Sequence, residues 1–376
     1  MRMGQLVSAA LLCVLGANAM AADLPASTKR QLQAMKLDAS ILAGLDAELV
    51  VPESWKEAAK SEPAAQILVT WSPEQFKKIT DSFRQRFPMA KIEGVRSSRD
   101  ARTTQPLVAY KQGKYVADII SNFTQTYDEM MAAGALADLR EIPNFKQAAP
   151  GMSDPEGSWV AGKTTYWCMS YNQDEVKQSA LPKEWDDLLA DPFWRSHLAL
   201  TNSAAGWLPP LWQAKGDEWG RTFMRRLFLE VKPQQRIEGR DAATQLVASG
   251  EIAAVMPAGD YRVRQLADLG APVGFHCPDL VPLAPAQMAI LRGSPGANSA
   301  KLFLNWYLSK EGQLAMHVET GDGPVHKDFQ RPEFAAYPEI VFSKTRKIQV
   351  DTLDRRVIAE IEDLWTKGWN HELPAR

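Results

Sequence analysis

Residues 67–76 read Ile-Leu-Val-Thr-Trp-Ser-Pro-Glu-Gln-Phe, and this stretch contains a short strand followed at once by the start of a helix. The aliphatic and β-branched run at residues 67–70 predicts a buried strand. Ser72 and Gln75 have the spacing of a capping box, with Pro73 at the first helical position. The stretch therefore predicts a βα unit, and the apolar residues expected on one face of its helix are Phe76, Ile79, Phe83 and Phe87.

The alternation of strand and helix continues along the chain, which favours βα units stacked into a parallel sheet. We expect two more strands at residues 92–95 and 116–120, with a helix at residues 100–112 that Gly113 ends. A second series begins after the aromatic stretch at residues 164–171. Its expected strands are 197–200, 252–256, 272–275 and 288–291, and its expected helices are 185–194, 218–230, 297–319 and 354–369.

The amino terminus has the layout of a secretory signal peptide, with a cationic start and an apolar run at residues 6–15. Small residues follow, and cleavage after Ala19 or Ala21 fits them. The run is shorter than the roughly 20 residues that a membrane span needs. Cys13 follows Leu12, where a lipoprotein has a small residue, so a lipid anchor is disfavoured. The sequence therefore predicts a periplasmic protein with a cleaved leader.

Length and charge restrict the class of protein. Removing 21 of the 376 residues leaves 355, which is more than one hydrophobic core usually serves, so two domains are expected. The net charge of −2 and the lack of a basic stripe argue against nucleic-acid binding. After export, Cys168 and Cys277 remain, and either a disulfide or two separate buried thiols fits them.

Motifs of enzymes are mostly missing. Residues 157–164 match the phosphate-binding pattern G-x-x-x-x-G-K-[ST], but they follow a turn and run into a β-rich segment, so no helix N-terminus is available for phosphate. The five His residues are scattered, and no H-E-x-x-H or G-x-S-x-G occurs. We therefore expect no catalytic residues, no cofactor and no structural metal site.

Candidate ligand-binding residues follow the predicted strands, because ligands of open α/β sheets lie at the carboxyl ends of strands. Arginines near a helix start oppose the helix dipole, which favours an anionic partner. Ordinary turns and helix caps explain the same residue types equally well. The candidates are Thr70, Trp71, Ser72, Ser97, Ser98, Arg99, Arg102, Ser121 and Asn122 in the first series, and Thr201, Asn202, Ser203, Asp260 and Tyr261 in the second.

The order of several short motifs resembles the iron(III)-type extracellular solute-binding proteins of ABC importers. These motifs include Trp-Ser-Pro-Glu-Gln-Phe at residues 71–76, Gly-Lys-Tyr-Val-Ala-Asp-Ile at 113–119 and Asp-Pro-Glu-Gly-Ser-Trp-Val at 154–160. Further matching segments are 181–189, 191–194, 270–273, 300–303 and 308–313, so the resemblance extends from about residue 67 to residue 313.

The resemblance implies the type II periplasmic-binding-protein fold, an α/β fold with two lobes, each a doubly wound sheet flanked by helices. A two-segment hinge near residues 165–172 and 285–291 would join the lobes and close on a ligand. The expected division is a signal peptide at 1–21, a helical N-terminal extension at 22–65, lobe 1 at 66–168 and 286–376, and lobe 2 at 169–285.

The resemblance also implies a function. A monomeric receptor would capture a small solute between its lobes and deliver it to a permease in the inner membrane. The Ser and Arg loops favour an organic anion such as a carboxylate or phosphonate, or a chelated metal. A ferric-ion receptor using Tyr261 and Asp260 is the alternative, since ferric-binding members have two adjacent Tyr there. An exported enzyme and a sensor input are lower-ranked alternatives, and no metal ligands are assigned.

Overall fold

The computed structural model describes residues 24–349 and 355–374, so the predicted signal peptide and Cys13 lie outside the described residues. The chain forms two compact units, of which unit 1 contains residues up to 147 and residues 289–319. Unit 2 contains residues 148–288 and the residues from 320 onward. The chain therefore passes from one unit to the other three times.

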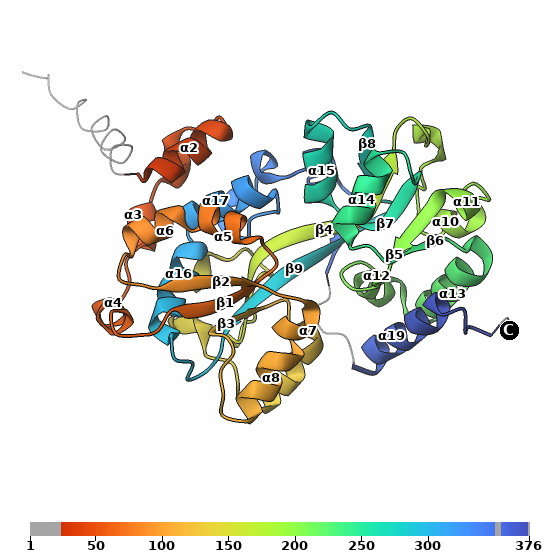
Figure 1. The fold of residues 1–376 in the computed structure, drawn as a ribbon. Coiled ribbons are helices and arrows are strands. Elements are labelled where there is room, and N and C mark those ends of the chain that lie inside the picture. The colour runs from red at the N-terminus through yellow and green to blue at the C-terminus, as the bar shows by residue number, and fades with distance from the viewer. Residues whose placement is uncertain (1–23, 350–354, 375–376) are drawn as a thin grey trace, which may run out of the picture. The chain divides into compact units, whose positions relative to one another are not determined.

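Unit 1 is built on the parallel strands β1 (Ala65–Val69), β2 (Ile92–Arg96) and β3 (Ile119–Ser121), with β1 in the middle. Figure 1 shows helices on both sides of this sheet, with α5 (Pro73–Ile79) and α6 (Asp81–Arg86) on one side and α8 (Thr104–Lys111) on the other. The capping box is present, because Ser72 Oγ accepts from Gln75 N and Gln75 Oε1 accepts from Ser72 N. The predicted βα unit is therefore confirmed.

Four helices expected to be continuous are interrupted. The helix that carries Phe76 and Phe83 is divided at Thr80 into α5 and α6, and the one expected at residues 185–194 is helical only at Asp187–Ala190, with a separate helix from Trp194. The helix expected at residues 100–112 is divided at the buried Thr103 into α7 (Arg99–Arg102) and α8. The helix expected at 297–319 is divided into α16 (Ala297–Tyr307) and α17 (Lys310–Thr320). Here a buried carboxylate, Glu48, accepts from the backbone N–H of Lys310 at 2.8 Å and so starts a new helix. Apolar periodicity does not reveal such a cap, because the capping residue is far away in the sequence.

The N-terminal extension is part of unit 1. Its helix α4 packs against α16, and α2 packs against α6. Glu48 fastens the extension to α17, and Glu62 accepts from the backbone N–H groups of Asn298 and Ser299 at the start of α16. The helices of this segment are α2 (Ala26–Ala34), η1 (Ala39–Leu42), α3 (Leu45–Glu48) and α4 (Glu53–Ala59).

Unit 2 is organised around the long strand β4 (Val160–Asn172). It pairs in antiparallel fashion with β7 (Ala254–Gly259), β8 (Val273–His276) and β9 (Leu280–Ile290). On the far side of β7, strands β5 (Leu198–Thr201) and β6 (Gln234–Arg236) continue the sheet in parallel, and β10 (Arg346–Ile348) pairs with β9. Cys168 and Cys277 form a disulfide, which decides between the two readings of these cysteines.

Tryptophans fill the core of unit 2, where Trp185, Trp194, Trp207 and Trp212 are fully buried. The last helix, α19 (Arg355–Trp369), packs against α13 (Asp217–Arg226). Arg221 bonds both carboxylate oxygens of Glu360, at 2.5 and 2.8 Å. Compactness thus groups residues 320–376 with residues 148–288, unlike the lobe boundaries expected from the sequence. The division into ligand-dependent lobes stays a prediction.

The remaining helices of unit 2 connect its strands and follow them. They are η5 (Gln178–Ala180), α10 (Asp187–Ala190), α11 (Trp194–His197), α12 (Leu208–Lys215), the π-helical turn η6 (Leu227–Val231), α14 (Arg240–Ala248), α15 (Asp260–Asp268), η7 (Lys327–Phe329), η8 (Pro332–Phe334) and α18 (Pro338–Val341). In unit 1, η2 (Thr124–Thr126), α9 (Tyr127–Ala132), η3 (Leu139–Glu141) and η4 (Pro143–Gln147) follow β3. No helix among the described residues is long and apolar enough to cross a membrane.

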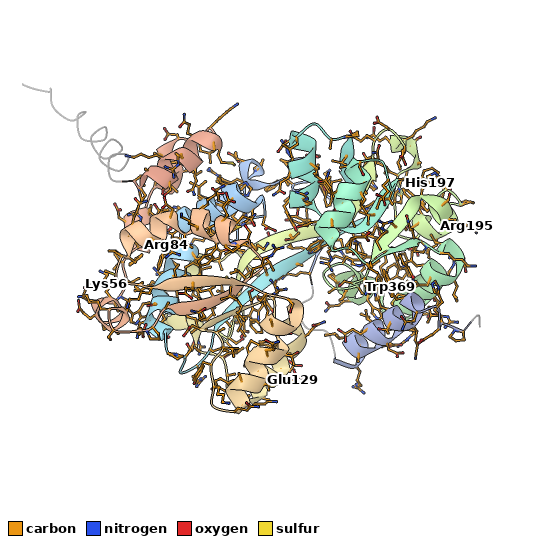
Figure 2. The ribbon with its side chains drawn as sticks, in the orientation of Figure 1. Lys56, Arg84, Glu129, Arg195, His197 and Trp369 are labelled. Carbon is orange, nitrogen blue, oxygen red and sulfur yellow. A yellow bond between two sulfur atoms is a disulfide. The ribbon has the colours of Figure 1, made fainter. Side chains whose placement is uncertain are left out.

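The histidine in α11 has a packing role. The ring of His197, labelled in Figure 2, stacks on Phe193 with 3.9 Å between ring centroids. Its Nδ1 lies 2.7 Å from the carbonyl oxygen of Phe193. This contact is typical of a side chain that holds a local turn.

The buried carboxylate of Glu311 accepts four hydrogen bonds. It accepts from the Arg86 guanidinium at 2.5 and 2.9 Å, from Trp306 Nε1 at 3.0 Å and from Thr28 Oγ1 at 2.7 Å. Its side chain is fully buried, whereas that of Arg86 is 20% exposed. One carboxylate therefore joins the extension, α6 and α16.

Glu311→Ala is expected to lower the free energy of unfolding of unit 1 by about 3–5 kcal/mol, because it leaves the guanidinium of Arg86 without its buried partner. Urea unfolding followed by circular dichroism measures the loss. Glu57→Ala is the control, since Glu57 pairs with Lys60 at the surface and exposed pairs contribute about 0–1 kcal/mol. Equal losses in the two variants would contradict the proposed role of Glu311.

Candidate functional site

The candidate residues of unit 1 meet at one edge of its sheet. The three strands are parallel, so the loops that follow them leave from the same side. The backbone N–H of Ser97 donates to the carbonyl of Val69 at 3.2 Å, and Ser121 Oγ donates to the carbonyl of Leu68 at 2.7 Å. The structure thus brings together the loops after β1, β2 and β3.

Within these loops, several side chains have structural contacts. Trp71 is only 7% exposed, and its ring lies 5.8 Å from the ring of Tyr307. Ser72 caps α5, and Ser98 Oγ accepts from the backbone N–H of Ala101 at 3.4 Å. Trp71 therefore belongs to the core, and the two serines serve as helix caps.

The remaining candidates of unit 1 are placed as follows. Arg102 donates to the carbonyl of Ser97, which closes the loop after β2. Thr70 is exposed, and Asn122 is half-buried with a φ of 53°, in the left-handed region that Asn tolerates. The side chain of Arg99 lies outside the described part of the chain.

The carboxyl ends of β5, β6 and β7 also meet, because these three strands of unit 2 are parallel. Thr201 and Ser203 follow β5, and Asp260 and Tyr261 follow β7. The loop after β6 leads into α14, which begins at Arg240. All five candidates of unit 2 therefore belong to one edge of the sheet, with the exposed Asn202 between Thr201 and Ser203.

A cation–π contact lies at this edge. The guanidinium carbon of Arg240 is 4.2 Å from the centre of the Trp167 ring, and Trp167 belongs to β4. Arg240 also donates to Ser203 Oγ at 3.2 Å and to the carbonyl of Ala205. A Cβ atom at Gly206, whose φ is +86°, would lie 3.0 Å from the Trp167 ring. The loop after β5 can therefore approach the indole only with glycine at this position.

Tyr261 is anchored beside this contact. Its hydroxyl donates to Asp241 Oδ1 at 2.6 Å, and Lys163 Nζ lies 5.6 Å from the centre of its ring. Burial and the neighbouring Asp241 carboxylate raise the pKa of the Tyr261 phenol well above its ordinary value. The phenol is therefore held in its neutral form, as a hydrogen-bond donor.

A buried group of charges lies behind Tyr261. Asp322 is 1% exposed, and it pairs with Lys163 Nζ at 2.5 Å and accepts from Thr165 Oγ1 at 2.8 Å. Asp260 is 2% exposed, and its Oδ1 accepts from the backbone N–H of Tyr166 at 3.1 Å. Burial, and then the charge of Asp322, raise the pKa of Asp260 from 3.8 to about 7.

Asp260 and Tyr261 thus contact different elements. The carboxyl of Asp260 faces the backbone of β4, whereas the hydroxyl of Tyr261 bonds to Asp241 in α14. A ferric ion held by both residues would need the Tyr261 hydroxyl and the Asp260 carboxyl to meet, but each is bonded to a different element. Among the described residues, no three or more His, Cys, Asp or Glu side chains are grouped to hold a metal ion.

The sequence analysis missed Trp167, Lys163, Arg240, Asp241 and Asp322. Arg240 follows β6, whose three residues Gln-Gln-Arg have no apolar pattern, so no strand was expected there. Trp167 was assigned only to an aromatic stretch, although its place on the central strand directs it to the site. A Gly-Arg-Asp turn at residues 239–241, followed by a periodic helix, was the available signal.

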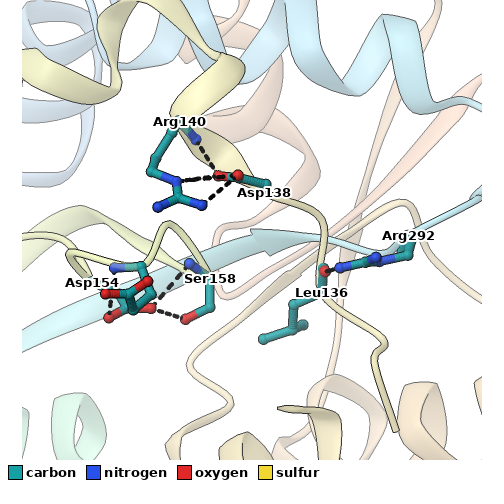
Figure 3. A network of polar contacts seen from close by, with 7 residues as sticks. Leu136, Asp138, Arg140, Asp154, Ser158 and Arg292 are labelled. Atoms are coloured by element: carbon teal, nitrogen blue, oxygen red, sulfur yellow. Dashed lines mark hydrogen bonds and ion pairs between the residues drawn. The ribbon is translucent and has the colours of Figure 1, made fainter.

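Lys163 lies in the segment that matched the phosphate-binding pattern. That segment is a turn followed by β4, and no helix begins at its end. Asp154 Oδ2 accepts from the backbone N–H of Ser158 at 3.1 Å and also from the hydroxyl of Ser158, as Figure 3 shows. An amide that a phosphate-binding loop would offer to its ligand is bonded here to a carboxylate. The interpretation of the match as chance is therefore supported.

Figure 3 also shows hydrogen bonds that hold two loops of unit 1. Arg292 donates to the carbonyl of Leu136 at 2.9 and 3.3 Å, and Arg140 bonds both carboxylate oxygens of Asp138 (Figure 3). Hydrogen bonds from Arg140 lower the pKa of Asp138 from 3.8 to about 2. These groups are satisfied by each other and position the chain where it re-enters unit 1.

Comparison with known proteins identifies the family. Residues 78–342 match the model of the bacterial extracellular solute-binding protein family. The match spans more than half of the chain, so the chain belongs to this family. The resemblance seen in the sequence motifs is thus confirmed. No curated protein sequence matches the chain.

Solved structures are similar over nearly their whole length. Iron-bound HitA from Pseudomonas aeruginosa has a TM-score of 0.61 at 17% identity, covering 81% of this chain and 99% of that one. MotA from A. tumefaciens B6 in complex with glucopine has a TM-score of 0.62 at 18% identity, covering 83% of this chain and 100% of that one. Apo ferric ion-binding protein A from Pasteurella haemolytica has a TM-score of 0.64 at 13% identity, covering 83% of this chain and 99% of that one. These similarities confirm the type II periplasmic-binding-protein fold expected from the sequence.

The raised pKa of Asp260 makes stability depend on pH. Because the folded pKa of about 7 exceeds the ordinary 3.8, this residue's contribution is fully present below pH 3.8 and is lost as the pH rises through 7. The free energy of unfolding of Asp260→Asn should therefore rise relative to that of the wild type by a few kcal/mol as the pH increases from 4 to 8. Thermal unfolding across this range measures the gain, with the exposed Asp46→Asn as the control. Parallel pH profiles for Asp260→Asn and the wild type would contradict the assignment.

Proposed function

We propose that this member of the bacterial extracellular solute-binding family is the periplasmic substrate-binding component of an ABC importer. It would act as a monomer after loss of the predicted signal peptide, and would deliver its solute to a permease in the inner membrane. Family membership supports the binding role. The ligand, the permease partner and the compartment are parts of the proposal.

The observation that carries the proposal is the guanidinium of Arg240 lying on the indole of Trp167 where three parallel strands end. Arg240 is the first residue of α14, so its positive charge lies at the positive end of the helix dipole. Such a charge is stabilised by an anion, and a planar guanidinium offers a carboxylate or phosphonate two parallel hydrogen bonds. An organic anion is therefore the ligand class that this edge supports best.

Unit 1 would contribute from its own strand ends. Thr70 and Asn122 are two candidates there, because the side chain of Thr70 is exposed and that of Asn122 is half-buried. Ser97, Ser98 and Arg102 build the loop after β2, so we expect them to act by holding the loop's shape. We infer that ligand would contact both units and close a hinge, because binding to two bodies at once favours their closed arrangement.

A ferric-ion receptor is less well supported. Tyr261 is kept neutral by burial and by Asp241, and Asp260 points to the backbone of β4. A chelated metal presented by an anionic carrier is still compatible with Arg240, because the guanidinium would bind the carrier. The two cases differ in whether iron alone binds.

Arg240→Gln should weaken binding of the natural solute about 10- to 100-fold, because it removes the charge-assisted bonds that we assign to the anion. Native mass spectrometry of the protein purified from its own periplasm identifies the solute, and calorimetry then measures the two affinities. Arg264→Gln is the matched control, since Arg264 forms an exposed pair with Asp268 on α15.

Two results would contradict this proposal. One is an unchanged affinity in Arg240→Gln, which would remove the anion site. The other is a wild-type protein that carries and binds no solute, which would remove the receptor function itself. A bound mass of a single ferric ion would favour the alternative receptor.

A further inference from the structure

We propose that the site in unit 2 recognises a zwitterion, with the carboxylate of the ligand at Arg240 and its ammonium group at Asp241. This inference rests on the proposed function and names its substrate class. It starts from the juxtaposition of opposite charges on neighbouring residues in the first turn of α14. The half-buried Arg240 and the exposed Asp241 both lie at the edge where β5, β6 and β7 end.

The two side chains are held by different neighbours. Arg240 lies against Trp167 and bonds Ser203 in the loop after β5. Asp241 accepts from the hydroxyl of Tyr261 in the first turn of α15. Adjacent residues of a helix point in different directions, so the positive and negative groups are separated along the edge instead of neutralising each other. A ligand with two opposite charges would match this arrangement.

Thr201, two residues before the Ser203 that Arg240 bonds, adds a second polar group at this edge. Its side chain is 2% exposed at the end of β5, and its hydroxyl has no hydrogen-bond partner among the described residues. A buried hydroxyl without a partner costs roughly 1–3 kcal/mol. A ligand oxygen at this edge would satisfy it. This observation is independent of the charge on Arg240.

The negative groups of the edge argue against a simple dianion. Asp241, Asp260 and Asp322 lie around Tyr261, and the positive groups beside them include Lys163 and Arg240. Arg262, the next residue of α15, donates to Gln245 Oε1, one turn along α14 from Asp241. Lys163 pairs with Asp322 and Arg262 bonds Gln245, whereas Asp241 is exposed and accepts from the hydroxyl of Tyr261. A second anionic group of the ligand would be repelled there. An ammonium group would instead be attracted to the carboxylate of Asp241.

The test uses matched probes with the full-length mature protein. The zwitterions are the proteinogenic amino acids and linear ω-amino acids. Each is compared with three probes: the carboxylic acid without its amino group, the amine without its carboxyl group, and a dicarboxylate of equal length. We expect at least one zwitterion to bind at least tenfold more tightly than each of its matched probes in calorimetry. An acid or a dicarboxylate that binds as tightly as the best zwitterion would overturn the inference, and so would the absence of binding by every zwitterion.

Two variants separate the ends of the ligand. Asp241→Asn should weaken the zwitterion about tenfold and leave the matched acid unchanged or tighter, whereas Arg240→Gln should weaken both. Asp268→Asn, from the exposed pair on α15, is the control that should change neither. An unchanged ratio of zwitterion to acid in Asp241→Asn would overturn the role of Asp241.

The outcomes also distinguish this inference from the proposed function. If a metabolite without an amine is identified on the periplasmic protein, the receptor function stands and the zwitterion is wrong. If ferric citrate binds and no zwitterion binds, the proposal of a zwitterionic ligand is likewise wrong. If no solute is found on the protein and no probe binds, both proposals fail.

Discussion

The antiparallel pairing of β4 with β7, β8 and β9 is the constraint on which the rest of unit 2 depends. Because side chains alternate along a strand, one register of β4 fixes the positions of Lys163, Thr165 and Trp167 together. The pairing of Trp167 with Gly259 places the indole next to the start of α15. A shift of one residue would turn the indole away from Arg240 and remove the partner of Asp322, so the register determines the site.

Charge at this site is arranged in two layers. The inner layer consists of the buried Asp260 and Asp322 and the half-buried Lys163. Its cost is limited because Asp322 pairs with Lys163 and because the pKa of Asp260 is raised to about 7. The outer layer, Arg240 and Asp241, is more open to solvent. Solvent screens the outer charges less when a ligand excludes water, so their discrimination between ligands is strongest in the bound state. The inner layer then acts mainly by holding Tyr261 in place and by setting the electrostatic potential around it.

Local signals predicted the βα units well, because capping boxes and apolar periodicity are properties of short segments. The Ser72 cap and β1 are examples. Features set by distant partners were not predictable in this way. The break before α17 depends on Glu48, and Arg240 follows a three-residue strand that is held only by pairing with β5. Residues that directly follow a predicted strand, such as Asp260 and Tyr261, could be predicted as candidates. Residues such as Arg240 and Trp167 could not, because their place in the site depends on which strands are neighbours.

The N-terminal extension shows how an added segment becomes part of a family's fold. The family match begins at residue 78, after the extension, yet two carboxylates of the extension, the buried Glu48 and the half-buried Glu62, bond to helices inside the matched region. Glu62 satisfies the first amides of α16 and Glu48 those of α17, which are the groups that a helix start leaves unbonded. Two helices of unit 1 therefore begin with hydrogen bonds from residues outside the segment that matches the family. The extension can be regarded as a structural requirement of unit 1, because its removal would leave both helix starts without these partners.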